Sequence, residues 1–171
     1  MVEERFGYAV CDSVLESANL SHGGAYTTVG TYPHEEMTRL LSALTLATGL
    51  TSKELLNAYG ERLFARFVVL YPLMFAGPVG TFAFLSTVDR HIHVEVRKLH
   101  PEAELPQFEH EITGDVMRLQ YRSRRPLGDL AEGLIRGCIS HFGETIGIAR
   151  EHDSGNGTAV VFVLQRSLPL Q

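Results

Sequence analysis

Apolar residues recur three or four positions apart through the first two thirds of the chain, a spacing that is typical of amphipathic helices. One short helix is expected near the start. A longer helix begins at Pro33, which suits a first-turn position and is followed by two glutamates. The apolar stripes are Phe6, Val10 and Val14 in the first helix, and Met37, Leu40, Leu41 and Leu44 in the second.

Two further helices are predicted before the middle of the chain ends. Thr51 and Glu54 have the spacing of a capping box, so a helix starts there, and Pro72 ends or kinks it. The next helix is expected from about Pro78 to His100, because a proline follows at once and cannot continue it. This helix carries His93 at the edge of an apolar stripe. The stripe consists of Leu85, Val88, Ile92, Val96 and Leu99.

The last third of the chain changes to a mixture of strands and one helix. Residues 153–157 separate two β-rich runs and predict a hairpin. Gly133 and Gly137 lie one helical turn apart, which suits close approach of a bound group or tight helix packing. The fold class is therefore α+β: an N-terminal helical subdomain, then an antiparallel sheet with at least one packed helix. The predicted elements are a strand at 116–122, a helix at 127–142 and strands at 146–151 and 158–164.

Length and charge narrow the possible functions. The 171 residues fit one domain, with a helical subdomain over about 1–60 and the remaining elements over about 61–171. A net charge of −5 argues against nucleic-acid binding. The absence of a signal-peptide pattern and of an apolar stretch of membrane length predicts a soluble, cytoplasmic protein with no membrane partner. Cys11 and Cys138 lack CxxC spacing and are expected to be buried thiols.

The end of the strand predicted at 116–122 carries a row of polar groups. At alternate positions stand Tyr121, Ser123 and Arg125, so a strand with a period of two would place them on one face. A phenol, a hydroxyl and a guanidinium form a set of hydrogen-bond donors that ends in a fixed positive charge. Such a set suits a carboxylate or a phosphate, although the solvated end of an ordinary strand has the same pattern.

His93 is the second candidate for chemistry. On a helix, His91 and His93 point about 200° apart, and His93 and His100 lie roughly 10 Å apart, so neither pair chelates one ion. A single imidazole is sufficient when a haem macrocycle supplies the other iron ligands. Taken alone, His93 also fits a partly buried imidazole with no ligand. With the Tyr-Ser-Arg row and the apolar helix faces, it supplies what a haem needs: a neutral imidazole, apolar walls and partners for two propionates.

These residues resemble a known family, the H-NOX (haem nitric oxide/oxygen binding) domains, bacterial stand-alone sensors related to the haem domain of soluble guanylate cyclase. The similarity covers the run His-Val-Glu-Val-Arg-Lys-Leu-His-Pro from His93, Pro106 and the Tyr-x-Ser-x-Arg signature, and it extends nearly end to end. The resemblance implies haem b (iron protoporphyrin IX), held between the helical subdomain and the sheet. It also implies that His93 ligates the iron, that Tyr121, Ser123 and Arg125 bind the propionates, and that Pro106 presses on the macrocycle.

The resemblance also bears on which gas is bound. Oxygen-binding members carry a distal tyrosine at the position that Leu130 occupies here. Bound dioxygen gains from a hydrogen-bond donor, whereas NO binds ferrous haem strongly without one. An apolar wall that includes Leu130 and Leu134 therefore favours NO. The resemblance predicts an NO sensor, with CO as a further ligand and no stable O2 binding.

Signalling would require a moving element and a partner. We expect NO to weaken the bond between iron and His93, so that the helix carrying His93 moves relative to the sheet. No kinase, cyclase or phosphodiesterase motif fits this length, so the chain is expected to be a sensor and not an enzyme. The resemblance implies a histidine kinase or a cyclic-di-GMP enzyme as partner. Family members usually begin further upstream, so either the start lies before Met1 or the distal side of the pocket is more open.

Two other functions remain open from the sequence. A haem-free interaction domain of the same fold would be colourless and catalytically silent. An enzyme could instead use His93 or His110 as a general base and the row ending in Arg125 as an anion site, and it would show turnover without colour.

Overall fold

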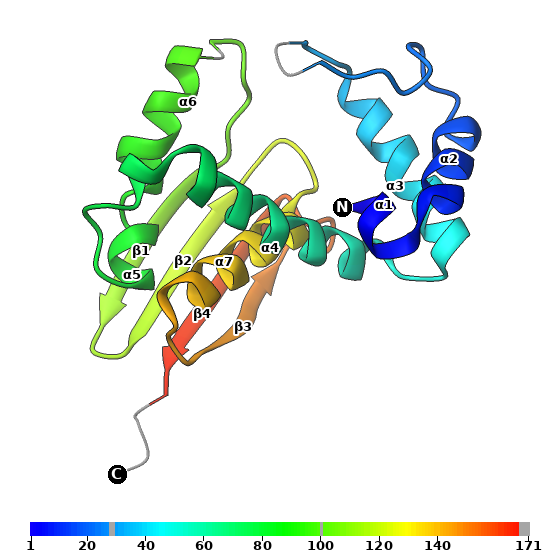
Figure 1. The fold of residues 1–171 in the computed structure, drawn as a ribbon. Coiled ribbons are helices and arrows are strands. Elements are labelled where there is room, and N and C mark those ends of the chain that lie inside the picture. Colours follow the sequence, from blue (N-terminus) through cyan, green and yellow to red (C-terminus); the bar gives the residue numbers. More distant parts are fainter. Residues whose placement is uncertain (28–29, 100, 168–171) are drawn as a thin grey trace. The chain divides into compact units, whose positions relative to one another are not determined.

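The chain forms two compact units in a computed structural model that describes residues 1–27, 30–99 and 101–167. The first unit is Met1–Leu55, and the second begins at Leu56 (Figure 1). The sequence predicts a helical subdomain that ends near residue 60. The division at Leu55 falls inside helix α4 (Ser52–Leu70), which begins in the first unit and continues into the second.

The first unit is helical, with one break that the sequence did not indicate. The stripe at Phe6, Val10 and Val14 predicts a single helix, but Gly7 adopts a φ of 86° and separates two helices. This left-handed region of φ is open to glycine and costly for other residues, so the break follows from Gly7 itself. The helices of this unit, besides the start of α4, are α1 (Val2–Phe6), α2 (Tyr8–Ser17) and α3 (His34–Thr48).

The capping box that predicts the start of α4 is confirmed. The Thr51 amide donates to Glu54 Oε2 at 2.8 Å, and the Glu54 amide donates to Thr51 Oγ1 at 3.2 Å. Each residue thereby satisfies a backbone donor that the first helical turn leaves without a partner. At its other end α4 stops at Leu70, and Pro72–Met74 form a 3-10 turn, η1, so Pro72 lies just beyond the helix end.

The helix expected from Pro78 to His100 is not continuous. After α5 (Thr81–Leu85), the Ser86 hydroxyl donates to the Phe82 carbonyl at 2.8 Å and the Thr87 hydroxyl donates to the Phe84 carbonyl at 2.7 Å. The Phe82 carbonyl keeps its helical bond from the Ser86 amide at 3.0 Å. The Phe84 carbonyl instead accepts from the amide and the hydroxyl of Thr87, only three positions on, so the α-helical pattern ends there. His100 lies outside the described residues. The segment contains α5 (Thr81–Leu85), a π turn η2 (Val88–Ile92) and α6 (His93–Leu99).

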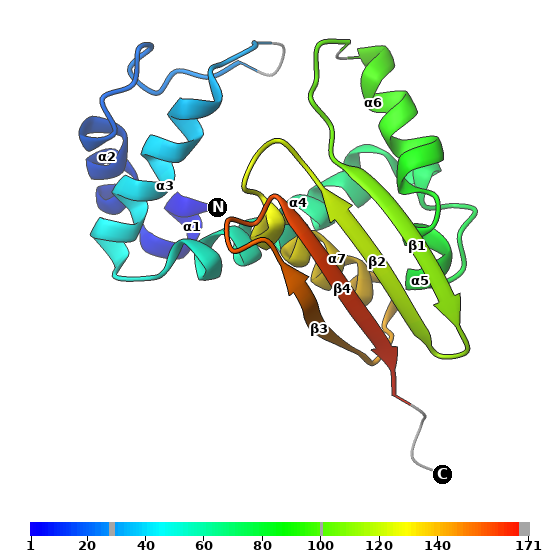
Figure 2. The same ribbon diagram turned by 180° about the vertical axis from the view of Figure 1, so that it is seen from behind.

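A four-stranded antiparallel sheet, in the order β1-β2-β4-β3, forms the centre of the second unit (Figure 2). The strands predicted from the sequence are present, but β1 was not predicted. Its side chains are exposed except for the half-buried Phe108, so it lacks the apolar alternation of a covered strand. Such a polar pattern is common at sheet edges. The strands are β1 (Gln107–Thr113), β2 (Val116–Arg122), β3 (Ile146–Asp153) and β4 (Ala159–Arg166).

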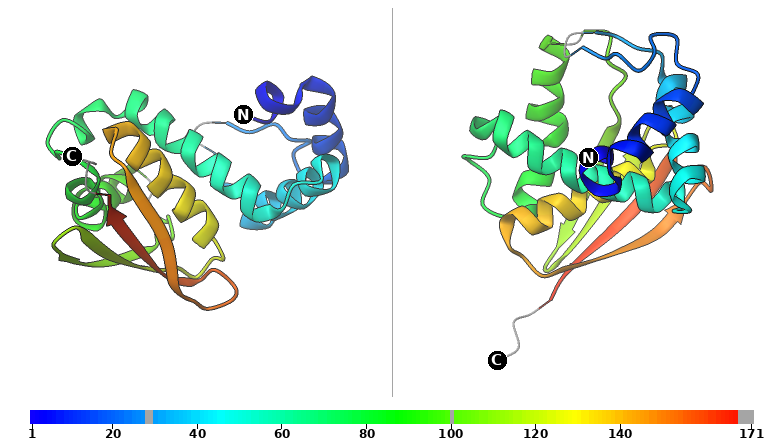
Figure 3. Two further views of the ribbon diagram at one scale, coloured as in Figure 1. Left: turned by 90° about the horizontal axis from the view of Figure 1, so that it is seen from below. Right: turned by 45° about the vertical axis from the view of Figure 1, so that its right-hand side comes forward.

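Helix α7 (Gly128–Phe142) covers one face of this sheet (Figure 3). The side chains of β2 and β4 that point toward α7 are fully buried, and they form the main core together with α7 and α5. The opposite sheet face carries the alternate, more exposed residues of the same strands. The buried strand residues are Met117, Leu119, Tyr121, Val160, Phe162 and Leu164.

Two glycines bring α7 very close to α4. A Cβ added at Gly133 would lie 2.2 Å from the Asn57 carbonyl oxygen, and one added at Gly137 would lie 2.7 Å from the Phe64 Cβ. Of the two explanations that the sequence allows for this pair of glycines, tight helix packing is therefore the one observed.

Candidate functional site

His93 is the first residue of α6 and is buried, with 8 % of its surface exposed. Its Nδ1 lies 2.8 Å from Asp89 Oδ1, one helical turn earlier. Because an ionised carboxylate can only accept, Nδ1 carries the proton in this bond, and in the neutral ring Nε2 keeps its lone pair. The arrangement is the one in which metal-binding histidines are commonly held, with a carboxylate on the nitrogen that does not bind the metal.

The electrostatic surroundings of His93 favour a neutral ring. Burial lowers the pKa of His93 below its usual value, and this effect exceeds the opposing effect of the hydrogen bond to Asp89. A neutral imidazole is the form that can bind a metal through Nε2. His93 therefore has the protonation state and the orientation of a potential ligand.

Three aromatic contacts connect His93 with the sheet. The ring centroids of His93 and Phe108 lie 5.8 Å apart, and those of Phe108 and Tyr121 lie 5.5 Å apart. Tyr121 in turn contacts Phe162 of β4, with their ring centroids 6.5 Å apart. Phe108 thus lies between two residues that the sequence selected separately, and it brings the histidine and the first residue of the polar row into one neighbourhood.

The polar row is not a row along a strand. Tyr121 is the last inward-facing residue of β2 and is 2 % exposed, but the strand ends at Arg122, so Ser123 and Arg125 belong to the following loop. The assumption that period-two geometry aligns all three residues is therefore wrong beyond Arg122. Burial raises the pKa of Tyr121, with a smaller opposing effect from the Ser123 side chain, so the phenol is a neutral hydrogen-bond donor.

Backbone hydrogen bonds hold the loop that contains Ser123 and Arg125. The Ser123 amide donates to the Thr158 carbonyl at 2.8 Å, and the Gly128 amide donates to the Gly157 carbonyl at 3.0 Å. The loop is thereby fastened to the turn between β3 and β4. Its side chains make local contacts, since Ser123 Oγ accepts from the Arg125 amide at 3.1 Å.

An acidic side chain lies beside the guanidinium of the row. Arg125 Nη2 is 3.5 Å from Glu104 Oε2, and both side chains are partly exposed. The same carboxylate contacts Arg124 Nη1 at 3.2 Å. The guanidinium of Arg125 thus already contacts a carboxylate, which is the kind of partner that the sequence predicts for it.

The remaining predicted residues lie on two other elements. Pro106 is half-buried and directly precedes β1. Leu130 and Leu134 are half-buried on α7, where their backbone faces Gly60 of α4. All seven residues selected from the sequence therefore belong to the second unit. They are His93, Pro106, Tyr121, Ser123, Arg125, Leu130 and Leu134.

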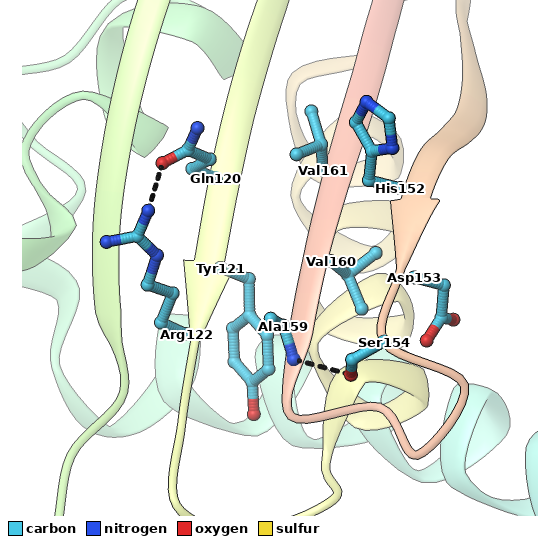
Figure 4. Close-up of a pocket in the computed structure, with 9 residues that line it drawn as sticks. All are labelled: Gln120, Tyr121, Arg122, His152, Asp153, Ser154, Ala159, Val160 and Val161. Atoms are coloured by element: carbon cyan, nitrogen blue, oxygen red, sulfur yellow. Dashed lines mark hydrogen bonds between the residues drawn. The ribbon is translucent and has the colours of Figure 1, made fainter.

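A surface cavity of about 300 Å³ lies at the end of the sheet near the β3–β4 turn (Figure 4). Its lining includes Gln120, Arg122 and Val161, which alternate with buried residues and so belong to the exposed sheet face. Tyr121 borders the cavity, but His93, Ser123 and Arg125 do not. The cavity is therefore not the place where the predicted site residues meet.

Within the described ranges, no three His, Cys, Asp or Glu side chains are grouped as a protein-only metal site. In the same part of the chain, no helix is long and apolar enough to cross a membrane. Neither cysteine forms a disulfide, and burial raises the pKa of the Cys138 thiol to about 12.

The donor set fits a haem better than a bare ion. It consists of one neutral imidazole, a buried phenol, a hydroxyl and a guanidinium, which suit an iron macrocycle with two carboxylates. The sequence profile of the haem-NO-binding family (HNOB) matches residues 1–150. The chain belongs to this family. It is accordingly a haem-binding sensor domain and not an enzyme.

Solved H-NOX structures share both sequence and fold with this chain. The Fe(II) unliganded H-NOX protein from K. algicida is 33 % identical, with a TM-score of 0.92 over 99 % of this chain and 92 % of its own. The H-NOX from Shewanella woodyi, bound to IWP-051 in the Fe(II)CO state, is 38 % identical, with a TM-score of 0.83 over 97 % of this chain and 88 % of its own.

A more distant H-NOX protein extends the likeness in fold alone. The S. oneidensis protein in the Fe(II)NO state is 22 % identical, with a TM-score of 0.88 over 98 % of this chain and 94 % of its own. Comparison with curated proteins gave no match.

Sequence reasoning missed two residues that contact His93. Asp89 lies four positions before His93, a spacing that places side chains on the same helix face, and this signal was present in the sequence. Phe108 could not be found in this way, because its contact with His93 depends on where β1 lies.

Proposed function

We propose that this protein is a haem-based gas sensor that binds nitric oxide at a ferrous haem b and signals to a partner protein. Family membership supports the haem, and the protonation state and buried setting of His93 support the choice of ligand. The haem iron would supply the gas-binding chemistry. The roles of the surrounding residues follow from their contacts.

His93 is proposed as the iron ligand through Nε2. Asp89 holds the proton on Nδ1, and burial keeps the ring neutral. His91, the alternative histidine on the same segment, is exposed and makes a poorer ligand on that ground.

Tyr121, Ser123 and Arg125 are proposed to bind the propionates. The Tyr121 phenol and the Ser123 hydroxyl donate hydrogen bonds, and the Arg125 guanidinium adds a fixed charge. Glu104 at 3.5 Å from Arg125 would compete with a propionate for that guanidinium. Pro106, directly before β1, is proposed to press on the macrocycle.

Leu130 and Leu134 are proposed to make an apolar distal wall. Neither side chain can donate a hydrogen bond, so bound dioxygen would lack the stabilisation that a hydroxyl provides. NO and CO need no such donor. We therefore propose NO as the physiological ligand and CO as a further one, without stable O2 binding.

The signal is proposed to leave the domain through movement of the segment that carries His93. A histidine kinase or a cyclic-di-GMP enzyme, in the cytoplasm, is the proposed partner. The support for movement is the break before η2 and the limited burial of η2 and α6, which make this segment less firmly packed than the sheet.

Visible absorption spectroscopy tests this function. After haem supplementation and reduction, the wild-type spectrum should show histidine-ligated ferrous haem, remain unchanged in air and shift with NO. A stable spectral change in air would contradict the gas preference. No Soret band with added haem would contradict the sensor function and favour a haem-free interaction domain.

Leu130→Tyr sharpens the same test, because it introduces a hydroxyl where the wild type has none. The variant should gain a spectral change in air that the wild type lacks. Leu134→Phe, which changes the size of the wall without adding a donor, is the control and should remain insensitive to air.

A further inference from the structure

The Asp89 carboxylate joins two elements of the second unit. Its Oδ1 faces His93 Nδ1 at 2.8 Å, and its Oδ2 accepts from the Phe108 amide at 3.0 Å. One oxygen therefore accepts a hydrogen bond from the histidine on the helical segment, and the other accepts one from the second residue of β1. Both bonds involve an ionised acceptor, which makes each of them stronger than a neutral hydrogen bond.

The position of Asp89 in the chain makes this double contact possible. Asp89 lies within the π turn η2 and His93 directly follows that turn, so the carboxylate and the imidazole project from neighbouring turns. Turns of this kind are uncommon and are often found at functional sites. Asp89 and Phe108 are 19 positions apart in sequence, so the second bond is tertiary.

The side chain of Phe108 adds a second connection along the same route. Its ring contacts the His93 imidazole at a centroid distance of 5.8 Å and the Tyr121 ring at 5.5 Å. A displacement of His93 therefore acts on β1 through the carboxylate at the Phe108 amide and through the Phe108 ring. Tyr121 on β2 is the next residue along this series of contacts.

We propose that Asp89 is the positioning residue that couples His93 to the sheet: it orients the imidazole and transmits its displacement to β1 at Phe108. This inference builds on the proposed role of His93 as iron ligand. A carboxylate on Nδ1 also makes the imidazole a stronger donor, so Asp89 opposes release of the ligand while it links the ring to the sheet.

Asp89→Asn is the decisive variant, with Glu95→Gln as the matched control. Both changes remove one carboxylate from the same segment, but Glu95 pairs only with the exposed Lys98 in the contacts described. The Asp89 side chain is 37 % exposed, so we expect the variant to fold. An amide has one acceptor oxygen where the carboxylate has two, so it cannot serve both donors equally.

The first readout uses haem-free protein. By NMR, the Phe108 amide should exchange with solvent about tenfold faster in Asp89→Asn, and the His93 Nδ1 proton should lose its carboxylate-bonded shift. Asp89→Glu, which keeps the carboxylate, should restore part of both signals. If the Phe108 exchange rate and the Nδ1 proton shift in Asp89→Asn both equalled the wild-type values, the proposed coupling through Asp89 would be wrong.

The second readout uses haem-loaded protein. The iron–histidine stretching frequency in resonance Raman spectra should fall in Asp89→Asn and stay unchanged in Glu95→Gln. NO should change the solvent-exchange rate of the Phe108 amide in the wild type, and this change should be smaller in Asp89→Asn. If NO changed the exchange rate equally in both proteins, the proposal that Asp89 transmits the displacement of His93 to β1 would be wrong. If the wild type bound no haem, the proposed function would fail, whereas the haem-free readout would still decide the Asp89 contacts.

Discussion

Two elements of the second unit carry proposed haem contacts, and they are held in different ways. Along 88–98, a stretch that the structure describes throughout, only the His93 side chain is buried. Helix α7, by contrast, buries residues along its whole length, packs its glycines against α4 and carries the buried Glu132. Elements with little buried apolar surface open and move at lower free-energy cost. The proposed ligand therefore lies on the more mobile element, and the proposed apolar wall lies on the fixed one.

The two elements also differ in their polar contacts. In the polar contacts described for residues 88–98, the Asp89 carboxylate is what joins the His93 segment to the sheet. On α7, Glu132 accepts from Arg136 and from Arg150 of β3, and Arg150 also contacts Asp129. A network with several charged partners resists displacement more than one shared acceptor does. A switch requires such a difference. The His93 segment would be the part that moves, and α7 the part that stays in place.

The largest effect is expected from Gly133→Ala, which breaks the packing of α7. The added Cβ would lie 2.2 Å from the Asn57 carbonyl oxygen, a backbone atom that cannot rotate away. We expect the free energy of unfolding of the haem-free protein to fall by more than about 3 kcal/mol in urea titrations. Gly77→Ala is the control, because its Cβ would meet nothing within 4 Å. Equal losses in the two variants would mean that α7 is not the tightly fixed element.

His93→Ala is expected to act on haem binding much more than on folding. Removing the ligand should weaken haem retention by more than about 100-fold, and added imidazole should restore a Soret band. The haem-free variant should unfold within about 2 kcal/mol of the wild type, since one hydrogen bond and the packing of one buried ring are lost. His91→Ala, at an exposed position of the same segment, should change neither quantity. Unaltered haem spectra in His93→Ala would refute the assignment of the ligand.

Glu132→Gln tests the polar network of α7. Although burial acts to raise it, the hydrogen bonds from Arg136 and Arg150 lower the pKa of Glu132 below its usual value. Since the folded-state pKa lies below the unfolded one, this carboxylate stabilises the protein above the unfolded pKa of about 4. That contribution is lost as the pH falls through the folded pKa.

The variant should therefore lose about 2 kcal/mol of unfolding free energy at neutral pH, because hydrogen bonds to charged partners are removed. Toward acid pH its stability should converge on that of the wild type. The measurement is urea unfolding of haem-free protein at a series of pH values. A difference that stayed constant from pH 7 to the acid limit would show that the charge of Glu132 is not the cause.

The smallest effect is expected from Arg125→Ala. The Arg125 side chain is 39 % exposed, so solvent screens its charge, and haem dissociation should accelerate only about threefold to tenfold. Arg124→Ala is the matched control, since Arg124 contacts the same Glu104 but is 86 % exposed. Transfer of haem to an acceptor protein measures both rates. Equal rates in the two variants would remove Arg125 from the propionate site.

The sequence by itself determined the elements whose signals are local. The capping box at Thr51 and Glu54 specifies where α4 begins, since both hydrogen bonds close within one turn. The alternation along β2 and the apolar stripe of α7 likewise predict those elements within a residue of their observed bounds. The same sequence also supplied the seven candidate residues and the family resemblance.

Only the tertiary structure decided how those residues are supported. The edge strand β1 has too few buried positions to show a pattern, yet it supplies Phe108, which lies between His93 and Tyr121. The loop with Ser123 and Arg125 is held by the turn between β3 and β4. Asp89 shares a helix face with His93, but its second bond reaches an amide 19 positions away. Sequence patterns report on neighbours within a turn or a strand, whereas these contacts exist only once distant segments have packed together.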